Sequence, residues 1–307
     1  MRIVFFGNTE FSNPTLNKCN SSYDIVSVVT NHSKQMGRGR KLLETPVKSL
    51  ADQLNLDIIE VDNLNDKNFI NQLKSLSPDL FVVVAYKVLP EELLEIPKLG
   101  SINLHSSLLP KYRGAAPIQH SIMNGDEVTG VSTFIIEPKV DTGNILLQKK
   151  CKIEKDDNYG TLSLKLSNIG AELIVESINK YHDKTLTPII QNNKLATLAP
   201  KIKREDYIID WNQDSFIVNN KIRAFSPYPG AYTIINNKRL KIFQAIVNKG
   251  INYKETGKII NLSKEYFEVT CSHGSLKIYN IQIEGKKRMS SKDFMIGFQD
   301  LEGVNLG

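Results

Sequence analysis

Short runs of apolar residues alternate with segments of helical spacing through the first half of the chain. The run at residues 80–86 is apolar at nearly every position, which is typical of a parallel strand buried on both faces of a sheet. Strands that alternate with helices need crossover connections, and these favour a doubly wound α/β sheet. The expected strands are residues 2–6, 23–30, 58–61, 80–86, 101–105, 131–136 and 145–153, and the expected helices are residues 9–18, 47–55, 66–76 and 159–182.

The pattern changes after residue 182. Residues 186–206 contain two X-Pro pairs and few large apolar side chains, so we interpret this stretch as a linker. Short alternating runs follow, and they favour a small OB-like β-barrel with a helix at 290–297. These runs are residues 231–235, 239–247, 257–262, 266–271 and 275–283. The predicted organisation is an α/β domain at 1–188, a linker at 189–207 and an OB-like domain at 208–307.

The composition is that of an ordinary globular protein, with 41% hydrophobic and 23% charged residues. The longest apolar run is too short to cross a bilayer, and residues 1–7 lack the features of a secretory signal. The three cysteines, Cys19, Cys151 and Cys271, lie far apart, and neither they nor the five histidines have metal-ligand spacing. We therefore expect a cytoplasmic protein without a membrane span, a disulfide frame or a bound metal.

The net charge of +6 lies entirely in the last third of the chain. Residues 1–200 carry 22 Lys and Arg against 22 Asp and Glu, whereas residues 201–307 carry 17 against 11. Such segregation suggests a polyanionic partner for the last third, although a surface tuned for solubility gives the same pattern.

Several common chemistries lack their motifs. The first expected strand is followed by Gly7-Asn8-Thr9-Glu10 and not by G-x-G-x-x-G, so dinucleotide binding loses its usual support. The chain also has no P-loop and no G-x-S-x-G nucleophile elbow.

Residues 101–119, SINLHSSLLPKYRGAAPIQ, carry the strongest candidate chemistry. Asn103 and His105 are two residues apart on an expected strand, so their side chains share one face of the sheet. A loop rich in Pro and Gly follows at the carboxyl end of this strand, where open α/β sheets bind ligands. Asp141-Thr142-Gly143 forms a turn motif before a later strand.

These three polar residues suit acyl transfer to an amine. Asn103 can donate a hydrogen bond to a developing oxyanion, His105 can exchange a proton near neutral pH, and Asp141 can fix the imidazole tautomer. An attacking amine needs no Ser or Cys nucleophile. Each residue also has a structural interpretation: Asn103 can bond loop backbone, His105 can be a core histidine, and Asp141 can cap its own turn.

The segment resembles the signature of the formyltetrahydrofolate-dependent formyltransferases. That signature is an Asn, a His two residues later, the sequence S-L-L-P and a distant D-x-G turn, matched here by Asn103, His105, residues 107–110 and residues 141–143. The resemblance covers nearly the whole chain. The chain further resembles those members of the family that act on tRNA. This resemblance rests on the runs LLPKYRGAAPIQ, MGRGRKLLETPVKSLA, IDWN, RAFSPYPG and GKKRMSSKDF.

The resemblance implies a Rossmann-like catalytic domain and a basic C-terminal domain that binds tRNA. It implies 10-formyltetrahydrofolate as the formyl donor and the α-amino group of methionine on initiator tRNA as the acceptor. Asn103, His105 and Asp141 would be catalytic, and we expect a monomer. The residues implied to bind the folate are Tyr86, Lys87, Val88, Ser107, Leu108, Leu109 and Pro110.

The implied tRNA contacts are basic residues in a loop after the second strand and in the last third of the chain. Cations flanked by glycines suit phosphate and an opened acceptor end, although a bare basic loop is often only solvated. The residues are Arg38, Arg40, Lys41, Lys203, Arg204, Lys286, Lys287 and Arg288.

The chain departs from the family pattern at two loops. The first turn lacks the usual proline after Thr9, and Lys87 stands in a loop where a glycine is usual.

Three other functions stay open. They are a formyltransferase acting on a small amine or nucleotide sugar, a non-catalytic RNA-binding protein, and a folate hydrolase that releases formate to water.

Overall fold

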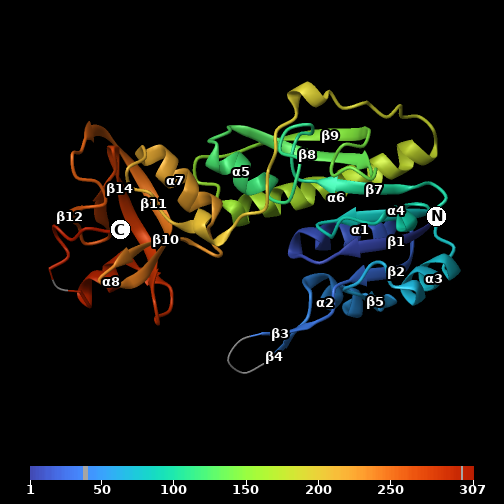
Figure 1. Ribbon diagram of the computed structural model, residues 1–307, viewed down its shortest axis with the longest axis horizontal. Coiled ribbons are helices and arrows are strands. Elements are labelled where there is room, and N and C mark those ends of the chain that lie inside the picture. The colour runs from blue at the N-terminus through green and yellow to red at the C-terminus, as the bar shows by residue number, and fades with distance from the viewer. Residues whose placement is uncertain (37–40, 299) are drawn as a thin grey trace. The chain divides into compact units, whose positions relative to one another are not determined.

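The structure is a computed structural model that describes residues 1–36, 41–298 and 300–307. The chain divides into two compact units, and Figure 1 shows the elements of each. The N-terminal unit consists of Met1–Pro117, Val128–Lys152 and Ser163–Pro200. The C-terminal unit consists of Ile118–Glu127, Ile153–Leu162 and Lys201–Gly307.

The N-terminal unit is built on a seven-stranded sheet with the order β5-β2-β1-β6-β7-β8-β9. The first five strands in this order pair in parallel, whereas β8 and β9 are antiparallel. The predicted doubly wound α/β fold is therefore confirmed. The strands are β1 (Arg2–Gly7), β2 (Asp24–Thr30), β5 (Ile58–Glu60), β6 (Leu80–Val84), β7 (Ser101–His105), β8 (Val128–Ile135) and β9 (Ile145–Lys152).

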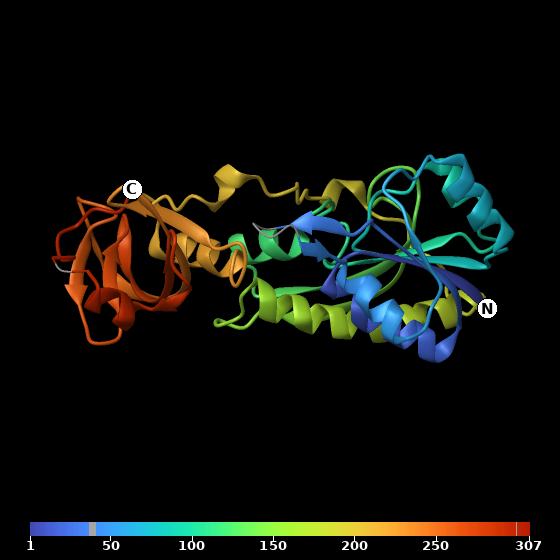
Figure 2. The same ribbon diagram turned by 90° about the horizontal axis from the view of Figure 1, so that it is seen from below.

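Helices cover both faces of this sheet. Figure 2 shows α1, α2 and α6 on one side and α3 on the other. Asp66 begins α3 because its carboxylate accepts hydrogen bonds from the amides of Asn68 and Phe69. The helical segments are the 3₁₀ turn η1 (Glu10–Ser12), α1 (Asn13–Ser22), α2 (Pro46–Gln53), α3 (Lys67–Ser75), α4 (Glu91–Leu94), α5 (Pro117–Met123) and α6 (Tyr159–His182). A short hairpin, β3 (Lys34–Met36) and β4 (Lys41–Leu43), was not expected from the sequence.

The C-terminal unit is built on an antiparallel sheet with the order β10-β11-β14-β13-β12, in which β15 also pairs with β14. This agrees with the prediction of a separate small β domain. Trp211, Phe267 and Phe294 belong to its buried core. The elements are α7 (Ser215–Ala224), β10 (Ala231–Ile235), β11 (Lys238–Asn252), β12 (Ile259–Leu262), β13 (Phe267–Thr270), β14 (His273–Ile283), β15 (Met289–Ser290) and α8 (Ser291–Ile296).

Residues 189–199, which lie in the stretch expected to be a linker, are bound to the N-terminal unit through their backbone. Ile189 pairs with Ile145 at the start of β9, and Leu198 pairs with Arg113. Ala199 donates a 2.7 Å hydrogen bond to the Arg113 carbonyl. A short 3₁₀ turn, η2 (Asn193–Leu195), interrupts this region, and a second, η3 (Arg204–Tyr207), follows it in the C-terminal unit. Because backbone groups make these contacts, side-chain hydropathy gives no sign of them.

Among the described residues, no helix combines the length and the apolar character needed to span a bilayer. The same residues hold no group of three or more His, Cys, Asp or Glu side chains arranged to bind a metal ion.

Candidate active site

The carboxyl end of β7 carries the polar side chains that the sequence singled out. Leu104 points to the α6 side, because a Cβ added at Gly170 of α6 would lie 2.5 Å from its Cδ2. Asn103 and His105 alternate with Leu104 and therefore face the opposite side of the sheet. In the antiparallel pairing with β8, Asn103 stands opposite Phe134 and His105 opposite Ser132. One face of the sheet thus presents an amide and an imidazole side by side.

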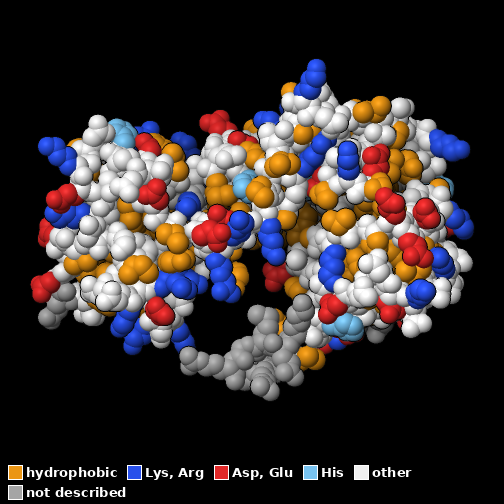
Figure 3. All heavy atoms as spheres, viewed as in Figure 1, with side chains coloured by type: hydrophobic (Ala, Val, Ile, Leu, Met, Phe, Trp, Pro, Cys, Tyr) orange, Lys and Arg blue, Asp and Glu red, His pale blue; other side chains and the backbone are white. Residues whose placement is uncertain are grey.

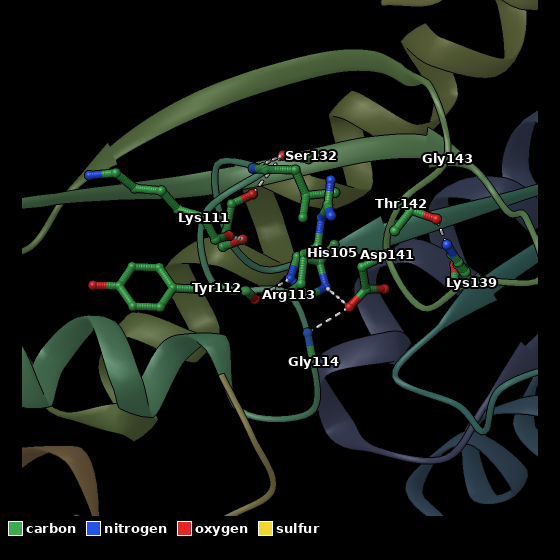
Figure 4. A network of polar contacts seen from close by, with 12 residues as sticks. His105, Lys111, Tyr112, Arg113, Gly114, Ser132, Lys139, Asp141, Thr142 and Gly143 are labelled. Atoms are coloured by element: carbon green, nitrogen blue, oxygen red, sulfur yellow. Dashed lines mark hydrogen bonds and ion pairs between the residues drawn. The ribbon is translucent and has the colours of Figure 1, made fainter. Parts of the chain in front are cut away.

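The two ring nitrogens of His105 have different partners. Nε2 lies 2.9 Å from the carbonyl oxygen of Tyr112, and Nδ1 lies 3.8 Å from Oδ2 of Asp141. A carbonyl only accepts hydrogen bonds, so Nε2 carries the proton and Nδ1 faces the carboxylate. Figure 4 shows His105 and Asp141 pointing toward each other. The His105 side chain is only 8% exposed, which shields this pair from water.

Backbone contacts and backbone geometry fix the position of Asp141. The amide of Gly114 donates a 2.7 Å hydrogen bond to Oδ2, the same oxygen that faces His105 (Figure 4). The backbone of Asp141 has φ +53°, a left-handed conformation that Asp tolerates better than most residues. Gly143 cannot carry a side chain, because a Cβ there would lie 1.7 Å from the carbonyl oxygen of Ile135. The glycine of the D-T-G sequence is therefore a geometric requirement of this turn.

The S-L-L-P loop, residues 107–110, is fixed by hydrogen bonds with Ser132 and Gln148. The Ser132 hydroxyl donates to the Ser107 carbonyl at 2.6 Å and accepts from the Leu109 amide at 3.0 Å. Gln148 donates to the Leu109 carbonyl at 2.9 Å. Ser107 and Leu109 are buried, whereas Leu108 and Pro110 are half-buried. This loop is a fixed wall beside the His105–Asp141 pair.

The loop after β6 contains the other residues expected to contact the folate. Lys87 stands in a loop where a glycine is usual, but its backbone does not adopt the left-handed conformation. Ala85 does adopt it, with φ +48°. The Lys87 ammonium donates to the Asp62 carbonyl at 2.8 Å. The Tyr86 ring packs against Phe6, and burial raises the pKa of its phenol above the ordinary value. Val88 is 63% exposed, so its side chain is the most accessible of the three.

The expected tRNA contacts fall into two groups. Arg38 and Arg40 lie outside the described residues, and so does the side chain of Lys41. The other five, Lys203, Arg204, Lys286, Lys287 and Arg288, are exposed on the C-terminal unit. Figure 3 shows Lys and Arg side chains gathered along the lower edge of that unit. Arg288 is more constrained than its neighbours, because its guanidinium stacks 4.2 Å above the Phe243 ring.

Two residues behind the Asp141 turn were not expected from the sequence. Gln191 and Arg113 are almost fully buried and contact each other, and Gln191 also contacts the turn. Arg113 stood in a quoted motif without a role, and Gln191 stood in the expected linker. A polar residue type by itself does not show that it is buried.

Comparison with known proteins places the whole chain. Residues 1–178 match the family model described as Formyl transferase, and residues 201–299 match the model described as Formyl transferase, C-terminal domain. The chain belongs to the formyl transferase family. Among curated relatives, methionyl-tRNA formyltransferase of Caldanaerobacter subterraneus subsp. tengcongensis is 41% identical over 309 residues, covering all of both chains. That of Thermodesulfovibrio yellowstonii is 45% identical over 305 residues, covering 99% of this chain and 98% of the relative.

Solved structures of other formyl transferases share the fold. The N-formyltransferase from Helicobacter canadensis in complex with folinic acid and dTDP-3-aminofucose aligns with a TM-score of 0.64 at 21% identity. The alignment covers 90% of this chain and 97% of that one. At this identity the likeness establishes the formyl transferase fold, and the chemistry has to come from the site itself.

Proposed function

We propose that the chain transfers the formyl group of 10-formyltetrahydrofolate to the α-amino group of methionine esterified to initiator tRNA. The observation that carries this proposal is the identity of 41% and 45%, from end to end, with two relatives named methionyl-tRNA formyltransferase. The buried His105–Asp141 pair at the end of β7 supports it, because this pair suits acyl transfer to an amine. We further propose that the enzyme is a monomer and acts in the cytoplasm.

The proposed reaction needs little activation of its nucleophile. An α-amine has a reference pKa of about 7.7–8.0, so a useful fraction is neutral near pH 7. A bond forms between the amine nitrogen and the formyl carbon, the bond from N10 to that carbon breaks, and the proton of the amine ends on N10. Negative charge gathers on the formyl oxygen before N10 leaves. The side-chain amide of Asn103 donates a hydrogen bond to this oxygen.

His105 and Asp141 manage the proton. The Tyr112 carbonyl holds Nε2 of His105, so Nδ1 is the atom left to take or give a proton. The Asp141 carboxylate faces Nδ1 at 3.8 Å and stabilises the imidazolium when His105 is protonated. Gly114 holds the same carboxylate oxygen and fixes its direction. The pair acts as a preorganised proton relay.

The residues around this pair suit a folate. The bound folate supplies the formyl group as an amide carbonyl. Val88 offers an exposed apolar side chain, and the loop at residues 107–110 is already rigid. The buried Tyr86 hydroxyl has no hydrogen-bond partner within the described part of the chain, an arrangement that is costly unless a polar group satisfies it. We propose that Tyr86, Lys87 and Val88 form one wall of the folate site and Ser107, Leu108, Leu109 and Pro110 another.

We assign tRNA binding to the basic residues of the C-terminal unit and of the loop after β2. In this proposal residues 1–188 perform the chemistry, residues 208–307 hold the tRNA, and residues 189–207 connect them. The proposed contacts are Arg38, Arg40, Lys41, Lys203, Arg204, Lys286, Lys287 and Arg288. Cations of this kind bind phosphate without reading sequence, and the resulting affinity depends steeply on salt.

One assay tests the proposed function against its alternatives. The protein is incubated with a labelled formyl donor and with either methionyl initiator tRNA or a charged elongator tRNA. The expected product is formyl-methionine on the initiator tRNA, formed faster than on the elongator. Formate released at an equal rate without any acceptor would instead identify a hydrolase. Label transferred to a nucleotide sugar in preference to tRNA would identify a sugar-modifying enzyme.

A further inference from the structure

Gln191 is a buried amide that touches the candidate catalytic turn directly. Gln191 is only 6% exposed, and it lies in the segment that connects the end of α6 to the C-terminal unit. Its Nε2 donates to two carbonyl oxygens of the turn, that of Asp141 at 3.0 Å and that of Gly143 at 2.7 Å. Two of the three turn residues are thus held by a single side chain.

Arg113 sets the orientation of this amide. Its guanidinium donates to Oε1 of Gln191 from Nε at 3.1 Å and from Nη2 at 2.7 Å, and Nη2 also donates to Asn193 at 2.8 Å. Only one amide orientation satisfies all four contacts of Gln191, because the guanidinium only donates and the two carbonyls only accept. A cation bonded to Oε1 also polarises the amide, so its N–H groups become stronger donors toward the turn.

The neighbours of Arg113 contact both members of the proton relay. The carbonyl of Tyr112 accepts from His105, and the amide of Gly114 donates to the Asp141 carboxylate. Arg113 lies between them in the chain, and its own side chain reaches the back of the Asp141 turn through Gln191 (Figure 4 shows this segment beside the turn). One tripeptide therefore sets the position of the imidazole, the carboxylate and the turn.

We infer that Gln191, oriented by Arg113, is a positioning residue that holds the Asp141 carboxylate against His105 during the reaction. This inference rests on the proposed formyl transfer and deepens it. Asp141 needs such support because its left-handed backbone, φ +53°, is maintained only by its surroundings. Without the two hydrogen bonds to its carbonyls, the turn can relax and the carboxylate shifts relative to Nδ1. Displacements of about 1 Å at a catalytic group reduce turnover on the order of 10²-fold.

Gln191→Glu is the sharpest test. Glutamate keeps an acceptor for Arg113 and gains an ion pair with it, but it places an oxygen against the two turn carbonyls in place of a donor. We expect kcat for formylation to fall on the order of 10²-fold. The KM values for the folate and for methionyl-tRNA should each stay within about a factor of two, because the residue acts on the transition state and not on substrate binding. Gln72→Glu, the same change at an exposed position of α3, should leave both parameters unaltered.

The outcomes separate this inference from the proposed function. If the unaltered protein does not formylate methionyl-tRNA, the proposed function fails. If it does, and Gln191→Glu keeps full kcat or changes only a KM, the inference is overturned. Thermal melting shows whether Gln191→Glu is folded at the assay temperature. If it is not, Asn193→Ala, which removes one hydrogen-bond partner of Arg113 at an exposed site, should lower kcat by a smaller factor. An unchanged kcat in that folded variant would also refute the inference.

Discussion

The candidate active site and the basic residues of the C-terminal unit solve different recognition problems. His105, Asp141 and Gln191 are buried or nearly so, and each has fixed hydrogen-bond partners. Lys286 and Lys287 are exposed to solvent. A reacting carbonyl needs donors at fixed positions, whereas a polyanion needs a sufficient number of cations. Substitutions in the first region should therefore have large, specific effects, and those in the second should have graded effects that depend on salt.

The largest effect should come from Asn103→Ala. Loss of one oxyanion donor lowers kcat by about 10²–10³-fold. Folate affinity should change little, because the donor acts on charge that develops only in the transition state. Single-turnover formylation and equilibrium folate binding measure the two quantities, and Asn68→Ala at an exposed position of α3 is the matched control. Retention of full activity would remove Asn103 from the mechanism.

A smaller, graded effect is expected when Lys286 and Lys287 are both replaced by Ala. The slope of log affinity for tRNA against log salt should become shallower by roughly 0.7–0.9 for each phosphate that is no longer neutralised. Turnover at saturating tRNA should not change. Filter binding over a range of salt concentrations gives the slope, and Lys67→Ala, an exposed cation of α3, is the comparison. An unchanged slope would mean that these two lysines do not bind phosphate.

The C-terminal unit also contains a buried carboxylate, Glu268, which should give a pH-dependent stability. Burial alone would raise the pKa of Glu268, but hydrogen bonds from Ser275, Asn248 and Asn261 outweigh it and hold the pKa below its ordinary value. Its ionised form thus stabilises the fold above the unfolded value of about 4.3, and this contribution is lost as the pH falls through the lower folded pKa.

Glu268→Gln should accordingly lower the stability at pH 7 and flatten its dependence on pH in the acidic range. Trp211 is the chain's one tryptophan and is buried in this unit, so its fluorescence reports the unfolding. Formylation by the folded variant should be normal. A variant as stable as the parent at pH 7 would show that the hydrogen-bonded carboxylate does not stabilise the unit.

The smallest effect is expected for Arg288→Lys. The substitution keeps the positive charge but removes the planar guanidinium that stacks on Phe243, an interaction that is worth about 0.5–1 kcal/mol at exposed sites. The salt dependence of tRNA binding should stay the same, and the melting temperature of the C-terminal unit should fall slightly. A changed slope with an unchanged melting temperature would mean that the guanidinium acts on the tRNA and does not stabilise the unit by stacking on Phe243.

The sequence predicted the parallel sheet well because its strands are buried on both faces. The strand at Ser101–His105 and the helix at Tyr159–His182 have the expected bounds, and the latter has an apolar face over many turns. The helix at Ser215–Ala224 was missed, because Val, Ile and two Asn residues give it weak helical propensity. Its start depends on Asp214, whose side chain accepts from the Phe216 amide.

Local sequence patterns also predicted part of the candidate site. Spacing alone places Asn103 and His105 on one face, and the turn motif marks Asp141. The contacts that orient these groups come from the carbonyl of Tyr112 and the amide of Gly114, and every residue except proline has both kinds of group. Gln191 and Arg113 are separated from each other by 78 positions, so no local pattern connects them. Backbone contacts and long-range pairs of polar residues become visible only in the folded chain.

The hydrogen bonds of residues 189–199 bear on where the chain can be divided. A catalytic fragment ended at residue 188 would lack Gln191, the Ile189–Ile145 pairing and the acceptor that Ala199 offers to Ala116. A fragment ended at Pro200 would retain all three. A cut between residues 188 and 191 would therefore weaken the support of the Asp141 turn, although it lies outside every α-helix and every sheet strand.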